Sequence, residues 1–99
     1  MIAPRIDHMG IVVADLDAAV TMFTSILVGS QVHAKDLPDV GLRIAIFEAA
    51  NISIELIQYT EDGSEFAQGV MGAAPGLNHF SVEVANLEPA AADMEATGF

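Results

Sequence analysis

Two histidines of this 99-residue chain, His8 and His79, occupy equivalent places in two similar stretches of sequence. The stretch IDHMGIVVADLDAA (6–19) aligns with LNHFSVEVANLEPA (77–90), with five of 14 positions identical and six more conservatively replaced. The match indicates an internal repeat that begins with a strand and a helix. In a domain built from two such halves, equivalent strands would bring the two imidazoles face to face across one cleft. A single strand histidine is more often a core or surface residue, so the repeat is what favours a paired role.

Glu55 is a third candidate, because it is an acidic residue between apolar neighbours, Ile54 and Leu56. Burying an unpaired carboxylate costs free energy, so such a residue is normally paired or bound to a metal. Two imidazoles and a carboxylate make a nitrogen and oxygen ligand set that suits a divalent ion such as Co, Ni, Zn or Mn. The sequence therefore predicts a metal site formed by His8, Glu55 and His79. The alternative is a polar patch inside a cupped sheet.

Five strands are expected to position these residues. Each is a run of β-branched and apolar residues bounded by turn residues, and the runs cover residues 5–14, 30–37, 42–48, 52–59 and 77–85. Some of them alternate polar and apolar residues, which is typical of a sheet with one face in a core.

Helices are expected between some of these strands. Apolar residues recur at helical spacing over 15–28, with Asp15 as N-cap and Gly29 just past the end. A short helical turn is predicted at 64–70. A last helix is predicted to be capped by Asn86 and to end near Gly98.

A resemblance to the vicinal oxygen chelate (glyoxalase/bleomycin-resistance) superfamily, and within it to the methylmalonyl-CoA epimerases, rests on three motifs in order. These are IDHMGIVVADLDAA, GLRIAIFEAANISIELIQ and GLNHFSVEVANLE. The resemblance covers nearly the whole chain. It implies an α+β fold of glyoxalase-like βαβββ modules within one domain, residues 1–99. Residues 5–59 would form a complete first module, 60–76 a connecting segment, and 77–99 a second module truncated after its helix.

The resemblance also implies a function, that of a divalent-metal-dependent epimerase acting by α-proton transfer on an acyl thioester such as methylmalonyl-CoA. It puts His8, Glu55 and His79 on three of the four usual metal-ligand positions. The counterpart of Glu55 in the second module would be the fourth, and the 99 residues do not reach it, so activity is expected to be impaired. The family's second glutamate is expected within 42–47, where this chain has Arg43 and no acid. Glu48 lies next to that segment and is the candidate catalytic base; otherwise it is a solvated strand end.

Two other functions remain open. A glyoxalase I-type lyase acting on a thiol adduct would use the same ligand set. A non-catalytic ligand-binding protein of the bleomycin-resistance type would hold its ligand in a dimer cleft without a metal. The loop over 59–76 favours the epimerase, and the histidine pair argues against the binding protein.

Composition limits the partners. With 14 acidic residues against three Lys and Arg, the net charge of −11 repels nucleic acid and anionic membranes. No apolar run approaches the roughly 18 residues needed to cross a bilayer.

The absence of cysteine excludes disulfides and thiolate catalysis. The N-terminus lacks the pattern of a secretory signal, so a cytoplasmic location is expected. The exposed strand edge of a half-finished second module predicts a homodimer or a larger assembly.

Overall fold

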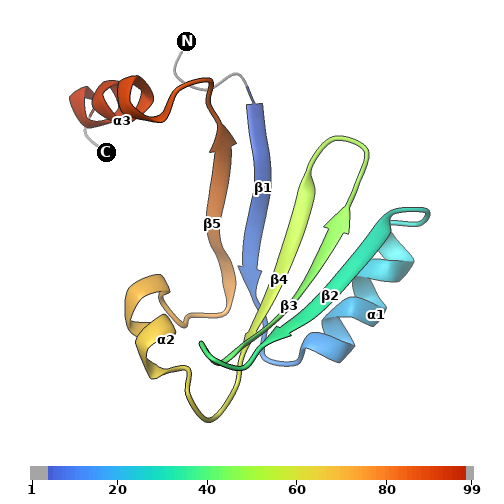
Figure 1. The fold of residues 1–99 in the computed structure, drawn as a ribbon. Coiled ribbons are helices and arrows are strands. Elements are labelled where there is room, and N and C mark those ends of the chain that lie inside the picture. The colour runs from blue at the N-terminus through green and yellow to red at the C-terminus, as the bar shows by residue number, and fades with distance from the viewer. Residues whose placement is uncertain (1–4, 98–99) are drawn as a thin grey trace.

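The computed structural model describes residues 5–97, which form a sheet of five strands accompanied by three helices (Figure 1). The strands lie side by side in the order β2-β3-β4-β1-β5, where β1 and β4 are parallel and all other neighbours are antiparallel. Along the chain the elements are β1 (Arg5–Val12), α1 (Leu16–Ile26), β2 (Gln31–Leu37), β3 (Leu42–Glu48), β4 (Ser53–Tyr59), α2 (Glu65–Met71), β5 (Gly76–Glu83) and α3 (Leu87–Ala96). The predicted α+β fold is confirmed: a complete βαβββ module, β1 to β4, is followed by α2, β5 and α3.

The predicted strands and helices are present, with ends that differ by no more than two residues. The first helix, for example, ends at residue 26 rather than at 28. Leu27 closes its last turn by donating its N–H to the carbonyl of Phe23 at 2.8 Å. Gly29 then turns the chain away with a φ of 85°, a conformation that favours glycine.

The N-terminal caps of α1 and α3 differ from each other. The Asp15 carboxylate accepts a hydrogen bond from the N–H of Ala18 at 3.1 Å, as the sequence predicted. Asn86 stands at the N-cap position of α3, but its side chain makes no capping hydrogen bond, so that part of the prediction was wrong. The position of a cap residue follows from the sequence, whereas its hydrogen bond depends on the side-chain rotamer. The predicted helix end near Gly98 lies outside the described residues.

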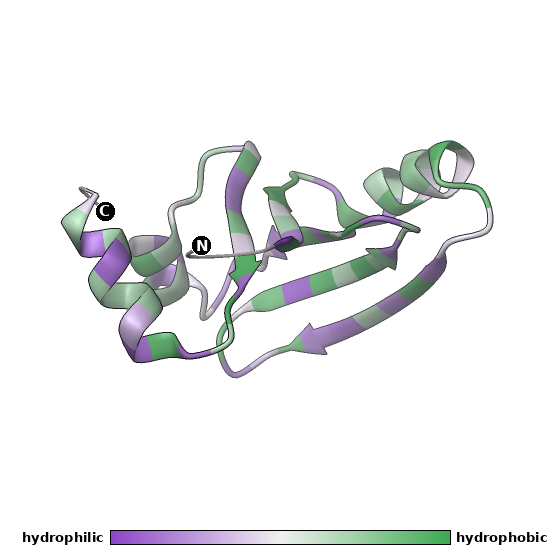
Figure 2. Cartoon of the chain, turned by 90° about the horizontal axis from the view of Figure 1, so that it is seen from above, coloured by the Kyte–Doolittle hydropathy of each residue, from purple (hydrophilic) through white to green (hydrophobic). Residues whose placement is uncertain are grey.

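One face of the sheet is covered by α1. Two buried residues of the helix pack against β3 and β4, and the core on this side consists of Leu16, Ala19, Ala45, Phe47 and Leu56. Figure 2 shows how the composition of the strands follows their place: β3, inside the sheet, is mostly hydrophobic, whereas β2, at its edge, is largely hydrophilic.

The opposite side of the sheet, which carries Val12, Ile44 and Ile57, is called the open face below. Helix α2 covers one end of it through Ala67, which packs with these three residues and Leu42. Within residues 5–97, no helix has both the length and the apolar character needed to cross a lipid bilayer.

Strands β1 and β5 pair about a local two-fold axis. Met9 lies opposite Phe80, and on either side of this pair His8 lies opposite Ser81 and Gly10 opposite His79. In the repeat, His8 corresponds to His79 and Gly10 to Ser81, each 71 residues further along the chain. The pair His8–Ser81 therefore becomes the pair Gly10–His79 when the two halves are exchanged. Equivalent residues of the two halves therefore meet where β1 pairs with the edge strand β5, as expected for a repeat that folds back on itself.

Candidate metal centre

The sheet register brings three of the predicted site residues to one place on the open face. Gly10 of β1 pairs with Glu55 of β4 on one side and with His79 of β5 on the other. Residues opposite each other on neighbouring strands share a face, and so do residues two apart on one strand. His8, two positions before Gly10, therefore projects on the same face as Glu55 and His79.

The side chains of His8, Glu55 and His79 form a tight cluster. Their potential ligand atoms all lie within 4.8 Å of one another. The two Nε2 atoms are 3.3 Å apart, and His79 Nε2 lies 3.7 Å from Glu55 Oε1. All three side chains are partly buried, with exposed fractions of 28%, 21% and 33% for His8, Glu55 and His79. The cluster is thus reachable from solvent but shielded by the sheet.

Neighbouring side chains hold the outer nitrogens of both imidazoles. His8 Nδ1 lies 2.9 Å from a carboxylate oxygen of Asp7, and His79 Nδ1 lies 2.8 Å from Asn78 Oδ1. The amide orientation of Asn78 is fixed because its Nδ2 donates to the carbonyl of Met71 at 2.8 Å. Since both partners are acceptors, we infer that each neutral ring carries its proton on Nδ1 and has a lone pair on Nε2.

Two lone pairs that face each other at 3.3 Å repel unless a proton or a cation lies between them. Histidine ligands of metals commonly donate their second ring N–H to a carboxylate or a carbonyl oxygen, as His8 and His79 do here. Nitrogen ligands about 2.1 Å from one divalent ion lie about 3 to 3.4 Å apart, which agrees with the Nε2 separation. The donor set and its spacing therefore fit a divalent ion, with a small movement of Glu55.

Glu48, the predicted base, lies outside this cluster. Glu48 is the last residue of β3. It lies opposite Ser53 of β4, which in turn lies opposite His8 of β1, so Glu48 is on the open face two strands away from His8. Its Oε2 lies 3.1 Å from Nε2 of His33 on the edge strand β2, and its side chain is half exposed.

Arg43 lies on the face that α1 covers, away from the cluster. Its guanidinium donates to Asp36 and to Asp17, each at 3.3 Å. The hydrogen bond to Asp36 and the nearby charge of Asp17 raise the pKa of Arg43. Because Arg43 is hydrogen-bonded to both acids and lies on the face of α1, its guanidinium is not available to a ligand on the open face.

Lys35 is a residue that the sequence analysis missed. Within residues 5–97, which contain all three Lys and Arg side chains, it is the one that forms no ion pair. It lines a hollow of about 380 Å³ on the open face, together with His33, Ile44, Ile46 and Glu55 among others. The alternation of polar and apolar residues over 30–37 was the signal that could have placed Lys35 on the same face as His33. A positive charge thus lies in a hollow that reaches the cluster.

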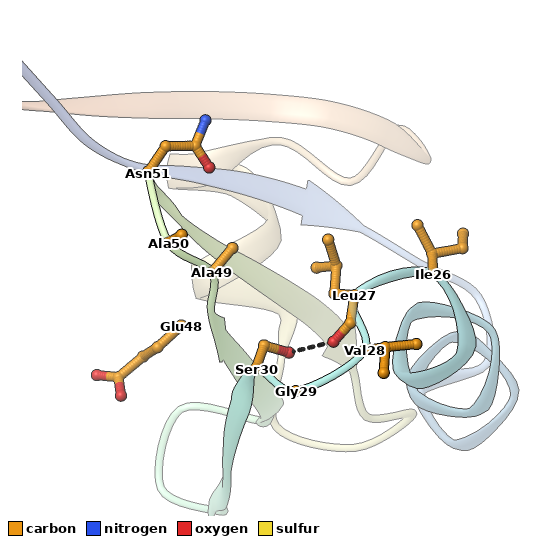
Figure 3. Close-up of a pocket in the computed structure, with 9 residues that line it drawn as sticks. All are labelled: Ile26, Leu27, Val28, Gly29, Ser30, Glu48, Ala49, Ala50 and Asn51. Carbon is orange, nitrogen blue, oxygen red and sulfur yellow. Dashed lines mark hydrogen bonds between the residues drawn. The ribbon is translucent and has the colours of Figure 1, made fainter.

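A second hollow, of about 570 Å³, lies where α1 ends beside the loop between β3 and β4 (Figure 3). Ser30 donates to the carbonyl of Leu27 at its rim, at 2.8 Å. Glu48 is the one ionisable residue among the nine that line it, and its carboxylate points away from Ile26 and Val28. This hollow holds no converging polar side chains, so the cluster on the open face remains the candidate site.

Known proteins resemble this chain in sequence. It is 31% identical over 93 residues to the mitochondrial methylmalonyl-CoA epimerase of Homo sapiens, an alignment that covers 92% of the chain and 52% of that protein. It is 34% identical over 86 residues to an ethylmalonyl-CoA/methylmalonyl-CoA epimerase of Cereibacter sphaeroides, covering 84% and 63%. The chain thus spans between half and two thirds of the length of these relatives.

The fold resembles solved structures of similar proteins. The methylmalonyl-CoA epimerase of Mycobacterium tuberculosis matches with a TM-score of 0.71 and 26% identity, over 98% of this chain and 66% of that one. The Streptomyces coelicolor methylmalonyl-CoA epimerase, solved with 2-nitronate-propionyl-CoA, matches with a TM-score of 0.66 and 27% identity, over 97% and 71%. A family model matches residues 7–99. The chain therefore belongs to the glyoxalase/bleomycin resistance protein/dioxygenase superfamily.

Proposed function

We propose that this chain forms the metal-binding part of an epimerase that moves the α-proton of an acyl thioester, such as methylmalonyl-CoA. The observation that carries the proposal is the cluster of His8, Glu55 and His79, in which the Nε2 atoms of the two histidines face each other at 3.3 Å. Relatives that cover most of the chain are epimerases by name. The proposal is that this chain shares their type of reaction and substrate.

In this proposal, Nε2 of His8, Nε2 of His79 and a carboxylate oxygen of Glu55 hold a divalent ion such as Co, Ni, Zn or Mn. When bound, the ion supplies a positive charge that stabilises the enolate oxygen as the α-proton leaves. Asp7 and Asn78 keep both imidazoles in the tautomer that leaves Nε2 free to bind. In this proposal a fourth ligand is the counterpart of Glu55 in the second half of the repeat, which these 99 residues do not include, so the site described has three protein ligands.

Glu48 is proposed as a base that takes the α-proton. It lies on the open face in one row with Ser53 and His8, so an acyl group seated between the cluster and β3 comes within reach of its carboxylate. His33, at 3.1 Å, holds that carboxylate in place. Proton exchange on both sides of the carbon needs a second group, which this part of the chain does not identify.

The hollow beside Glu55 is proposed as the place where the acyl-CoA enters. Its floor is apolar through Ile44 and Ile46, and Lys35 adds a positive charge to it. In a chain with a net charge of −11, that charge offsets the repulsion of an anionic thioester.

The metal site is tested by equilibrium dialysis against Co²⁺ followed by metal analysis. The wild-type chain is expected to bind one equivalent of Co²⁺. His8→Ala and His79→Ala remove a ligand and are each expected to weaken binding at least about tenfold. His33→Ala is the matched control, because its imidazole lies outside the cluster, and it is expected to leave the Co²⁺ affinity unchanged.

The reaction is tested by NMR, as exchange of the α-proton of methylmalonyl-CoA with deuterium from the solvent. Exchange that depends on Co²⁺ and disappears in His79→Ala supports the epimerase. A wild-type chain that neither binds Co²⁺ nor catalyses exchange would contradict the proposal and leave the non-catalytic ligand-binding protein as the function to pursue.

We also propose that two copies of the chain associate through β5. This strand is an edge of the described sheet, and a hollow of about 450 Å³ beside it is lined by apolar residues of β5, by Asn78 and His79, and by Met94 of α3. Leu77 and Phe80 in that hollow are 63% and 58% exposed. An apolar edge strand of this kind is a template for pairing, and a second copy would cover it.

A further inference from the structure

Gly10 lies in the middle of β1, where a glycine is normally unfavourable. Glycine weakens a strand because it loses more conformational entropy than other residues and has no side chain to pack. The φ of Gly10 is not positive, unlike that of five other glycines within residues 5–97. Its backbone conformation is therefore open to any residue, and the reason for a glycine must be the space around it.

That space is filled by the imidazole of His79. A Cβ atom built on Gly10 would lie 2.1 Å from Cε1 of His79 and 2.6 Å from both of its ring nitrogens. These separations are far shorter than any van der Waals contact. The ring of His79 thus lies over β1, at the place where a side chain of residue 10 would be.

The register explains why this matters for the cluster. Gly10 is the strand partner of both Glu55 and His79, so it stands between two of the three ligand residues. With the ring over Gly10, Nε2 of His79 reaches 3.3 Å from Nε2 of His8 and 3.7 Å from Glu55. A side chain at position 10 would turn the ring outward and separate these atoms.

We propose that Gly10 is a positioning residue, whose missing side chain lets His79 turn across β1 to face His8 and Glu55. Its counterpart in the repeat is Ser81, which lies opposite His8 and has a side chain. The two halves of the cluster are therefore unequal: His79 depends on a glycine, and His8 does not. The inference rests on the proposed function only where metal binding is measured.

The test compares Gly10→Ala with two controls. Gly69→Ala adds the same methyl group in α2, where nothing lies within 4 Å of the new Cβ and φ is not positive. Ser81→Ala alters the equivalent position beside His8 but keeps its Cβ. The metal-independent readout is the nuclear Overhauser contact between ring protons of His8 and His79, whose ring centroids are 5.4 Å apart. Circular dichroism and urea unfolding check that every variant is folded.

Gly10→Ala is expected to lose the contact between the two rings and to bind Co²⁺ at least about tenfold more weakly, while both controls keep the contact and the affinity. If Gly10→Ala retains the ring contact and binds Co²⁺ like the wild type, the positioning role is wrong, although the metal site stands. If the ring contact is lost in Gly10→Ala but the wild-type chain binds no Co²⁺, the positioning role stands and the proposed function fails.

Discussion

Glu48 and Glu55 lie on the same face of the sheet but have different neighbours. Glu55 is next to two imidazoles at the centre of the sheet, whereas Glu48 pairs with His33 near its edge. This separation allows the binding of an ion and the removal of a proton to be tested independently at the scale of single residues.

Glu48→Gln is expected to lower kcat for α-proton exchange by about two to four orders of magnitude, because an amide cannot take up the proton. Its Co²⁺ affinity is expected to stay at the wild-type value, since Glu48 is not part of the cluster. Both quantities are measured by the exchange and dialysis experiments described above. A variant with unchanged kcat would remove Glu48 from the mechanism and leave it as a polar strand end.

Lys35 differs from Arg5 and Arg43 in having no acidic partner among residues 5–97. Lys35→Gln is expected to raise KM for an acyl-CoA several-fold with little change in kcat, because the loss concerns attraction of the anionic substrate. The difference from the wild type is expected to shrink as salt is added, since ions screen exposed charges. Arg5→Gln, which removes an exposed charge paired with Glu83, serves as the control. Equal KM values for Lys35→Gln and the wild type at low salt would exclude this role.

At the scale of elements, the two helices that follow β1 and β5 begin in similar sequences but differ in their caps. Asp15 accepts a hydrogen bond from the first turn of α1, and Asn86 makes none in α3. Asp15→Ala is therefore expected to lower the free energy of unfolding by about 1 kcal/mol. Asn86→Ala is expected to change it by less than about half of that amount. Urea unfolding of both variants measures these values, and equal losses would contradict the difference between the caps.

The sequence was sufficient to predict the elements, because apolar periodicity and turn residues act locally. It also indicated His8, Glu55 and His79, since the repeat relates the histidines and the apolar neighbours of Glu55 mark it as unusual. The role of Gly10 was not predictable in this way. It depends on the pairing of β1 with β5, which shifts at two points, between Ile6 and His8 and between Gly10 and Ile11. Such shifts change which side chains meet, and no local pattern reveals them.

Lys35 and Arg43 illustrate the same limit for charges. Both are cations in strands, and composition alone does not separate them. The ladder between β2 and β3 puts Arg43 beside Asp36 on the face of α1, and it puts Lys35 beside Ile44 on the open face. The register between β2 and β3 decides on which face of the sheet each cation lies, and the sequence alone does not give that register residue by residue.

At the scale of the whole molecule, the edge strand β5 combines an unpaired edge with exposed apolar residues. Phe80→Ser is expected to raise the dissociation constant of the proposed dimer at least about tenfold, because large aromatic residues dominate such interfaces. Ile26→Ser is the control, since Ile26 is 62% exposed at the end of α1, which packs against β3 and β4. Sedimentation over a range of concentrations measures both. A wild-type chain that is monomeric at all concentrations would contradict the proposed association.

The pairing of Met9 with Phe80 has an evolutionary consequence. An ancestor encoding a single half could join two identical subunits through the same ladder, and any histidine acquired beside the axis would then occur twice in the assembly. One codon change would have created both imidazole donors at once. Fusion of two such genes would then let the halves diverge, and such a divergence would account for Asp7 against Asn78 and for Gly10 against Ser81.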